Sequence, residues 1–108
     1  MSLSEWTVEF LNDSVEAEFD NIPPQVRAKA VQISKLITEF GLAGLSMPYI
    51  RHVQDKIWEI RASHGRCLYI TATGRKVVIL RCFFKKSNKL PKKELKIALE
   101  RAREIDNG

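Results

Sequence analysis

Three apolar stretches in the second half of the chain are separated by links of only a few residues, around "SHG" (63–65) and "TG" (73–74). Links this short join strands that are antiparallel neighbours. The sequence therefore predicts three adjacent antiparallel strands, at about Lys56–Ala62, Arg66–Thr73 and Arg75–Lys86.

The glycines in these links also predict how the strands are aligned. A two-residue turn at Gly74-Arg75 fits type II′, which favours glycine in its first position. This turn sets up three opposed pairs, which are Cys67 with Cys82, Leu68 with Arg81, and Arg66 with Phe83. A similar turn at His64-Gly65 places Arg61 opposite Leu68.

Side chains alternate between the two faces of a strand, so the predicted register assigns each residue to a face. One face is nearly all apolar and is expected to lie beneath the helices: Trp58, Ile60, Cys67, Tyr69, Val78, Leu80, Cys82 and Phe84. The other face mixes apolar residues with four cations and one carboxylate: Arg61, Arg66, Arg81, Lys85 and Glu59. Arginine binds phosphate bidentately and its plane stacks on bases, so this face is predicted to bind an RNA backbone with exposed bases.

The remaining segments follow from periodicity and from helix-breaking residues. They predict a strand at "WTVEF" (6–10), a short helix ending near Asp20, a helix over about Pro24–Phe40, a loop at 42–55 and a helix over about Pro91–Ile105. The expected fold is a single α+β domain over residues 1–108, in the order βααβββα. Its small, mostly antiparallel sheet is expected to carry the helices on one face.

The charges are strongly separated along the chain, which has a formal net charge of +5. There is no Lys or Arg before Arg27, and no Asp or Glu between Ile60 and Lys93. This separation predicts a strongly positive region, whose natural partner is a polyanion such as nucleic acid. The alternative is a basic surface that serves solubility and has no dedicated partner.

Other functional classes find little support in the sequence. No apolar run approaches the length of a membrane span and no secretory signal opens the chain, so we expect a cytoplasmic protein. Cys67 and Cys82 have neither CxxC spacing nor a nearby pair of histidines, so they are expected to be reduced core residues. We expect neither a metal nor a cofactor.

Several motifs resemble those of the RelE/HigB superfamily, especially its phage-derived HigB-like branch. "IWEIR" (57–61) is similar to the family's "[LY]-[WY]-E-[LI]-R", and "GRCLYI" (65–70) is similar to its "xR[VI]LYx" strand. "VVILRCFFKKSNKLPKKELKIALERAREI" (77–105) contains the family's Phe-x-Lys-Lys-[ST] segment and the Pro and Glu that follow it. The resemblance covers nearly the whole chain, in the right order.

The resemblance implies a toxin of a type II toxin–antitoxin pair, which enters the ribosomal A site and cuts mRNA there. The implied partner is an antitoxin with a helix-turn-helix DNA-binding domain. Many relatives have His where this chain has Arg81, and several use a C-terminal Tyr or His that this chain lacks after Pro91. Two alternatives are a non-catalytic toxin that binds a protein such as gyrase, and a basic RNA- or DNA-binding module.

An RNase of this kind makes the ribose 2′-OH attack the adjacent phosphate. The enzyme must take the 2′ proton, stabilise the charge on phosphorus and protonate the leaving 5′ oxygen. The candidate catalytic residues are Arg61, Arg66, Arg81, Lys85, Lys86 and Glu59. Glu59 is either a base or the salt-bridge partner that orients Arg61. The candidate RNA-binding residues are Arg75, Lys76, Lys89, Lys92 and Lys93.

Overall fold

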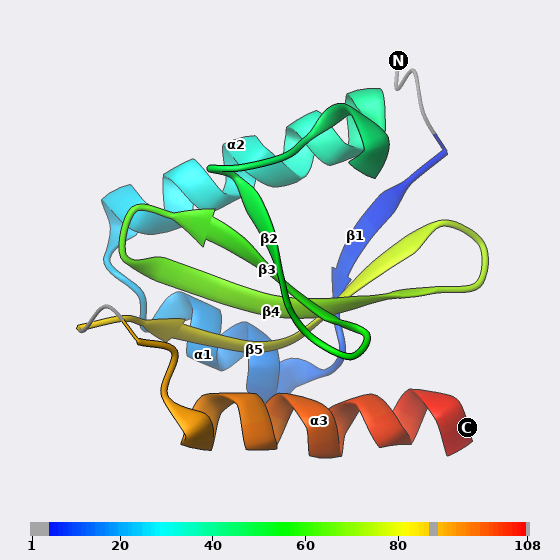
Figure 1. The fold of residues 1–108 in the computed structure, drawn as a ribbon. Helices are drawn as coiled ribbons and strands as arrows, with labels where there is room; N and C mark the ends of the chain where they lie inside the picture. The colour runs from blue at the N-terminus through cyan, green and yellow to red at the C-terminus, as the bar shows by residue number, and fades with distance from the viewer. Residues whose placement is uncertain (1–4, 87–88, 108) are drawn as a thin grey trace.

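The computed structural model describes residues 5–86 and 89–107, and Figure 1 shows their arrangement. The elements in chain order are β1 (Thr7–Phe10), α1 (Asp13–Asp20), α2 (Pro24–Phe40), the short 3₁₀ helix η1 (Leu42–Gly44), β2 (Ile50–Gln54), β3 (Ile57–Ala62), β4 (Gly65–Ala72), β5 (Lys76–Phe84) and α3 (Lys92–Asn107). The predicted α+β class is confirmed, and each predicted helix and strand is present near its expected bounds.

The strands form one five-stranded sheet in the order β1-β5-β4-β3-β2. β1 runs parallel to β5, and the other neighbours are antiparallel. β2 corrects the predicted order, because it falls in the segment that was expected to be a loop. Only Ile50 of β2 is buried, so this edge strand has no alternation of apolar and polar residues for sequence analysis to detect.

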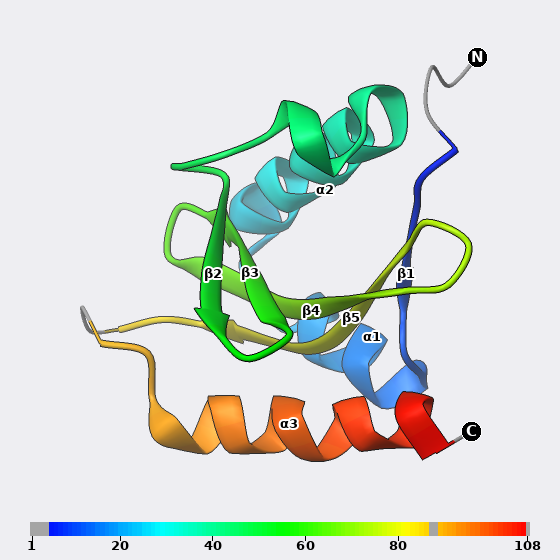
Figure 2. The same cartoon turned by 45° about the vertical axis from the view of Figure 1, so that its right-hand side comes forward.

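The helices cover both faces of the sheet, with α2 across one face and α3 across the other (Figures 1 and 2). Ile33 and Ile37 of α2 share a core cluster with Tyr69 of β4, whereas Ala98 of α3 lies in a second cluster with Leu68. The prediction that the helices share one face is therefore wrong. An amphipathic stripe shows which side of a helix is buried, but it does not show which face of a sheet that side meets.

β5 carries one more residue than β4 across their pairing. The three predicted pairs, Arg66–Phe83, Cys67–Cys82 and Leu68–Arg81, are all present. Tyr69, however, pairs with Ile79, so Leu80 is the extra residue of a β-bulge. Between the bulge and the turn the predicted faces are exchanged: Val78 and Leu80 lie in the cluster under α3, and Ile79 lies in the cluster under α2.

The turn before β5 explains why the predicted pairs are correct on the side of the bulge that is away from the turn. Ala72 pairs with Lys76 around three residues, so the turn is one residue longer than the predicted Gly74-Arg75 turn. Gly74 and Arg75 both have positive φ angles, of 87° and 60°. The longer turn and the bulge shift the register by one residue each in opposite directions, so they cancel at the open end of the hairpin.

The β3–β4 turn also differs from the prediction. Ala62 pairs with Gly65, so the two turn residues are Ser63 and His64, and Ser63 adopts a positive φ of 58°. Arg61 is therefore opposite Arg66 and not opposite Leu68. Gly65 is needed at this position because an added Cβ would lie 2.5 Å from Cγ1 of Val26 in α2.

The two cysteines face each other in the core as free thiols, with 3.6 Å between their sulfur atoms. The contact with Cys67 and burial both raise the pKa of the Cys82 thiol, so it stays protonated at neutral pH. The prediction that both cysteines are core residues is thus confirmed. Within residues 5–86 and 89–107, none of the helices has the length and apolar composition that a membrane crossing requires.

Candidate functional site

Two arginines meet where β3 ends and β4 begins. Arg61 and Arg66 are directly opposed, so their side chains share a face of the sheet. Glu59 precedes Arg61 by two residues on the same face of β3 and lies between the two guanidinium groups. Its Oε1 is 3.6 Å from Nε of Arg61, and its Oε2 is 3.8 Å from Nε of Arg66. Both distances exceed those of charge-assisted hydrogen bonds, at about 2.7–2.9 Å, so this ion triad is loose.

Arg66 and Glu59 are nearly inaccessible, with exposed fractions of 5% and 4%. Nη1 of Arg66 donates to the carbonyls of Ser63 at 2.7 Å and Gly65 at 2.8 Å, so its guanidinium also holds the β3–β4 turn. Burial lowers the pKa of Arg66, and the charge of Glu59 offsets part of this effect. Arg66 thus supports the turn and contributes positive potential from a buried position. Arg61 is the more accessible of the two arginines.

β2 and the residue before it bring two further side chains to this face, both from the segment that was expected to be a loop. Arg51 pairs with Glu59, and Tyr49 lies opposite Arg61, whose backbone N–H donates to the Tyr49 carbonyl at 2.7 Å. Both Arg51 and Tyr49 are exposed. Sequence reasoning missed Arg51 because only its pairing with Glu59 associates it with the other arginines.

A groove of about 480 Å³ opens beside Glu59, between β2 and the start of α3. Three cations contribute to its lining, namely Arg51, Lys85 and Lys89. Leu90 and Leu95 line the groove on the side of α3. An anion that enters this groove therefore meets positive side chains from two edges, with Arg61 and Arg66 next to them.

Lys85 follows β5 directly and is held against the β3–β4 turn. Its backbone N–H donates to the His64 carbonyl at 2.6 Å. Burial lowers the pKa of the Lys85 ammonium, and the positive charges of Arg66, Arg61 and Arg51 lower it further, while Glu59 opposes them. A lysine in this setting gives up its proton more easily than a lysine in water.

The other predicted basic residues lie at both ends of the sheet. Lys86 and Lys89 are exposed after β5, and Lys92 and Lys93 are exposed in the first turn of α3; of these four, Lys89 lines the groove. Arg75 and Lys76 lie at the opposite end of β5, where Lys76 pairs with Ala72, about 20 Å along β4 from Arg66. Arg75 is also ion-paired with Glu5 at 3.6 Å. We therefore leave Arg75 and Lys76 out of the candidate site.

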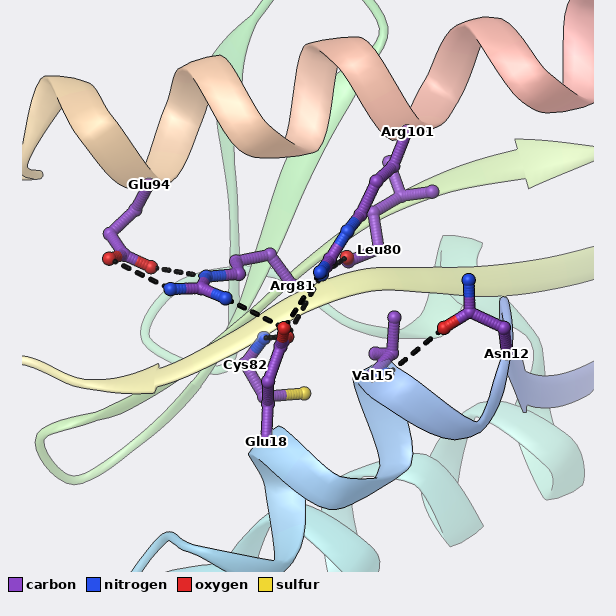
Figure 3. Close-up of polar contacts among 8 residues, drawn as sticks. All are labelled: Asn12, Val15, Glu18, Leu80, Arg81, Cys82, Glu94 and Arg101. Atoms are coloured by element: carbon purple, nitrogen blue, oxygen red, sulfur yellow. Dashed lines mark hydrogen bonds and ion pairs between the residues drawn. The ribbon is translucent and has the colours of Figure 1, made fainter.

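Arg81 is on the same face as the cluster but is held by two carboxylates, as Figure 3 shows. Its Nε is 2.6 Å from Oε2 of Glu94, and its Nη1 is 2.6 Å from Oε2 of Glu18. Nη2 adds a third hydrogen bond to Glu94 at 3.3 Å. The expectation that Arg81 clamps a phosphate is corrected accordingly, because its donors are already directed at Glu94 and Glu18.

Arg101 extends this network to the β-bulge. Its Nη1 donates to the carbonyl of the extra residue, Leu80, at 2.7 Å, and its Nη2 donates to Glu18 at 2.8 Å. Glu18 also accepts from the Cys82 backbone N–H at 3.3 Å. Burial acts to raise the pKa of Glu18, but the hydrogen bonds from Arg101 and Cys82 and the nearby positive charges outweigh it, so the pKa is lowered. The network therefore joins α1, β5 and α3.

Metal chemistry finds no support in the described part of the chain. Among residues 5–86 and 89–107, no group of three or more His, Cys, Asp or Glu side chains is placed to hold a metal ion. What this site offers is a set of neighbouring guanidinium groups and a lysine whose pKa is lowered, which suits binding and proton transfer at a phosphodiester.

A protein-family model described as "Phage derived protein Gp49-like (DUF891)" matches residues 17–103. The chain belongs to this Gp49-like family. The matched range includes every strand except β1, and therefore every residue of the candidate site. No curated protein is similar enough to this Gp49-like chain to count as a match.

Two solved structures share the fold of this Gp49-like protein. A chain of the toxin–antitoxin complex RelBE2 from Mycobacterium tuberculosis aligns with a TM-score of 0.55 and 19% identity, covering 80% of this chain and 98% of that chain. A chain of the archaeal RelE–RelB complex from Pyrococcus horikoshii OT3 aligns with a TM-score of 0.61 and 10% identity, covering 76% and 97%. The RelE-like fold expected from the motifs is thus confirmed, and at these identities the likeness concerns the fold alone.

Proposed function

We propose that this Gp49-like protein is the toxin of a toxin–antitoxin pair and that it cleaves mRNA on the ribosome. The observation that carries the proposal is the cluster of Arg51, Arg61, Arg66 and Lys85 around the buried Glu59, beside an open groove. Both fold neighbours named above come from toxin–antitoxin complexes, which supports the toxin role. The expected partner is a helix-turn-helix antitoxin, and the expected site of action is the cytoplasm.

In this proposal the scissile phosphate binds at Arg61 and Arg51, which flank Glu59 from β3 and β2. Guanidinium groups suit this role because they bind phosphate oxygens bidentately. The sheet fixes the backbone positions of both arginines, so their guanidinium groups start close to where charge builds on phosphorus. Glu59 acts as the salt-bridge partner that holds Arg61 and Arg66, because its 4% exposed fraction leaves little access for a 2′-OH.

Lys85 is the proposed acceptor of the 2′ proton. Its lowered pKa increases the fraction of neutral amine at a given pH, and the neutral amine is the form that accepts a proton. The 2′ oxygen then bonds to phosphorus while the bond to the 5′ oxygen breaks, which leaves a 2′,3′-cyclic phosphate and a 5′-OH once the leaving oxygen is protonated. Lys86, exposed next to Lys85, is the nearest candidate for that second proton transfer.

Induction of the protein alone tests the proposal, because a toxin of this kind should stop growth and translation. Co-expression of the neighbouring gene product should reverse the arrest. RNA from arrested cells should carry new cleavage ends inside reading frames. The variant Arg51→Ala/Arg61→Ala should lose this activity, whereas Arg103→Ala, which removes one exposed cation from the other half of α3, should keep it.

One observation favours a second candidate function. The chain has no Tyr, His or Cys after Pro91, where several relatives of the superfamily carry a catalytic side chain. A non-catalytic toxin that binds a protein such as gyrase would arrest growth and leave mRNA intact. Normal growth together with normal protein synthesis after strong induction of soluble protein would contradict both toxin functions and leave a basic nucleic-acid-binding module.

A further inference from the structure

We infer that Tyr49 stacks on an RNA base, next to the phosphate that Arg61 holds. This inference rests on the proposed function and adds a base-binding residue to it. No motif in the sequence singled out Tyr49, because it lies in the segment that was predicted to be a loop. Its place opposite Arg61 emerges only from the pairing of β2 with β3.

The strand register places Tyr49 at the end of a row of side chains that crosses the sheet. Arg61 accompanies Tyr49 on β3, Arg66 is opposite Arg61 on β4, and Phe83 is opposite Arg66 on β5. Two arginines thus stand between two aromatic residues. Phe83 packs against the core under α3, so Tyr49 is the member of this row whose ring is offered to solvent, with an exposed fraction of 41%.

The backbone of Tyr49 is fixed on both sides. Its N–H donates to the Ser46 carbonyl at 2.9 Å, and its carbonyl accepts the Arg61 N–H at 2.7 Å. A ring on a fixed backbone loses little conformational entropy when a ligand stacks on it. The backbone of Tyr49 is therefore held in place even though this residue precedes the first residue of an edge strand.

A small pocket of about 180 Å³ lies at this residue, lined by Lys29, Pro48, Tyr49, Arg61 and Ser63. Its described lining includes two cations and no carboxylate. Arg61 therefore belongs both to the ion triad with Glu59 and to this pocket. A phosphate bound at Arg61 would carry its neighbouring base towards Tyr49.

The chemistry around Tyr49 favours a nucleobase over an apolar protein side chain. Single-stranded RNA is recognised by stacking its unpaired bases on aromatic rings, with cations placed along the backbone. Lys29, which is exposed on α2, is suitably placed for a flanking phosphate. An apolar partner residue would gain from the ring of Tyr49 but would make no use of the two cations that line the pocket.

Equilibrium binding to programmed ribosomes tests the inference. The probe is an mRNA whose A-site codon carries 2′-deoxyriboses, which removes the attacking 2′-OH and isolates binding from cleavage. Tyr49→Ala should weaken binding roughly 5- to 150-fold, the range expected for one stacked base. Tyr49→Phe keeps the ring and should bind within about twofold of the wild type. In a second mRNA series, each A-site nucleotide is made abasic in turn, and at one position Tyr49→Ala should cause no further loss.

The possible results separate this inference from the proposed function. Wild-type affinity in Tyr49→Ala, or an equal loss in Tyr49→Phe, overturns the stacking role while growth arrest and mRNA cleavage by the wild type still stand. Unchanged ribosome binding together with weaker antitoxin binding would assign Tyr49 to the protein partner and would also overturn it. If the wild type neither binds ribosomes nor arrests growth, the proposed function fails as well.

Discussion

Glu18 of α1 and Arg81 of β5 are joined by an ion pair of 2.6 Å, and Arg101 of α3 donates to the same carboxylate. Through this carboxylate, the helix that follows β1 and the helix that follows β5 are both fastened to β5 (Figure 3). Glu18 also binds the Cys82 N–H on the stretch of β5 beyond its pairing with β1, which ends at Ile79. The network is therefore placed to stabilise the fold.

Arg81→Met should reduce stability and leave RNA contacts at the groove intact. The substitution keeps much of the side-chain length but leaves Glu18 and Glu94 without the guanidinium between them. We expect a loss of about 2–3 kcal/mol in the free energy of unfolding, measured by urea denaturation, because a partly buried ion pair loses one partner. Arg103→Ala is the matched control. If Arg81→Met kept full stability but failed to cleave RNA, this prediction would be wrong and Arg81 would belong to the active site.

Acid should remove part of the stabilisation that Glu18 provides. The pKa of Glu18 is lowered in the folded protein from its usual value of 4.5. A carboxylate of this kind stabilises the fold above its unfolded pKa, and this contribution is lost as the pH falls through the folded pKa. Urea unfolding should show a gap in stability between wild type and Glu18→Gln at neutral pH, and the gap should narrow as the pH falls below 4.5. A gap that stays constant would show that the charge of Glu18 does not contribute.

Arg51→Ala should weaken RNA cleavage without harming the fold. Arg51 is exposed on an edge strand, so its truncation should change stability by no more than about 0.5 kcal/mol. The lost hydrogen bonds to phosphate should reduce single-turnover cleavage on ribosomes about tenfold or more. Arg103→Ala again controls for the loss of one positive charge. Equal activity of the two variants would exclude Arg51 from the site.

Lys85→Arg separates the charge of Lys85 from its proton transfer. Arginine keeps the positive charge but stays protonated at any working pH, so it cannot accept the 2′ proton. Ribosome binding should persist, while the cleavage rate should fall about 10²- to 10⁴-fold. With Lys85 as the base, the wild-type rate should rise with pH and level off below the ordinary lysine pKa of 10.5. Full activity of Lys85→Arg would reduce the role of Lys85 to electrostatic stabilisation.

Much of the fold follows from local sequence signals, because each predicted helix and strand carries its own periodicity or turn residues. β2 does not, since four of its five residues are exposed or half-buried and its only strong signal is its pairing with β3. No local sequence pattern encodes which face of the sheet α3 packs against. The bulge at Leu80 is also non-local, because it compensates for a turn one residue longer than expected.

The candidate site divides in the same way. Glu59, Arg61 and Arg66 share a face because of simple alternation on β3 and β4, so sequence reasoning could group them. Arg51 and Tyr49 were missed with β2. Arg81 was assigned to the right face but to the wrong partner, a phosphate. Its carboxylate partners, Glu18 and Glu94, belong to two separate helices, and no local pattern links them to β5.

The network of Glu18, Glu94, Arg81 and Arg101 balances its own charges, since two carboxylates meet two guanidinium groups. The formal net charge of +5 therefore resides elsewhere, largely on exposed side chains that dissolved ions screen well. Nucleic-acid affinity falls with a log–log salt slope of about −0.7 to −0.9 per neutralised phosphate, whereas ion pairs withdrawn from solvent are screened much less. Moderate salt should consequently release this protein from polyanions while it remains folded, and dilution should restore the bound state.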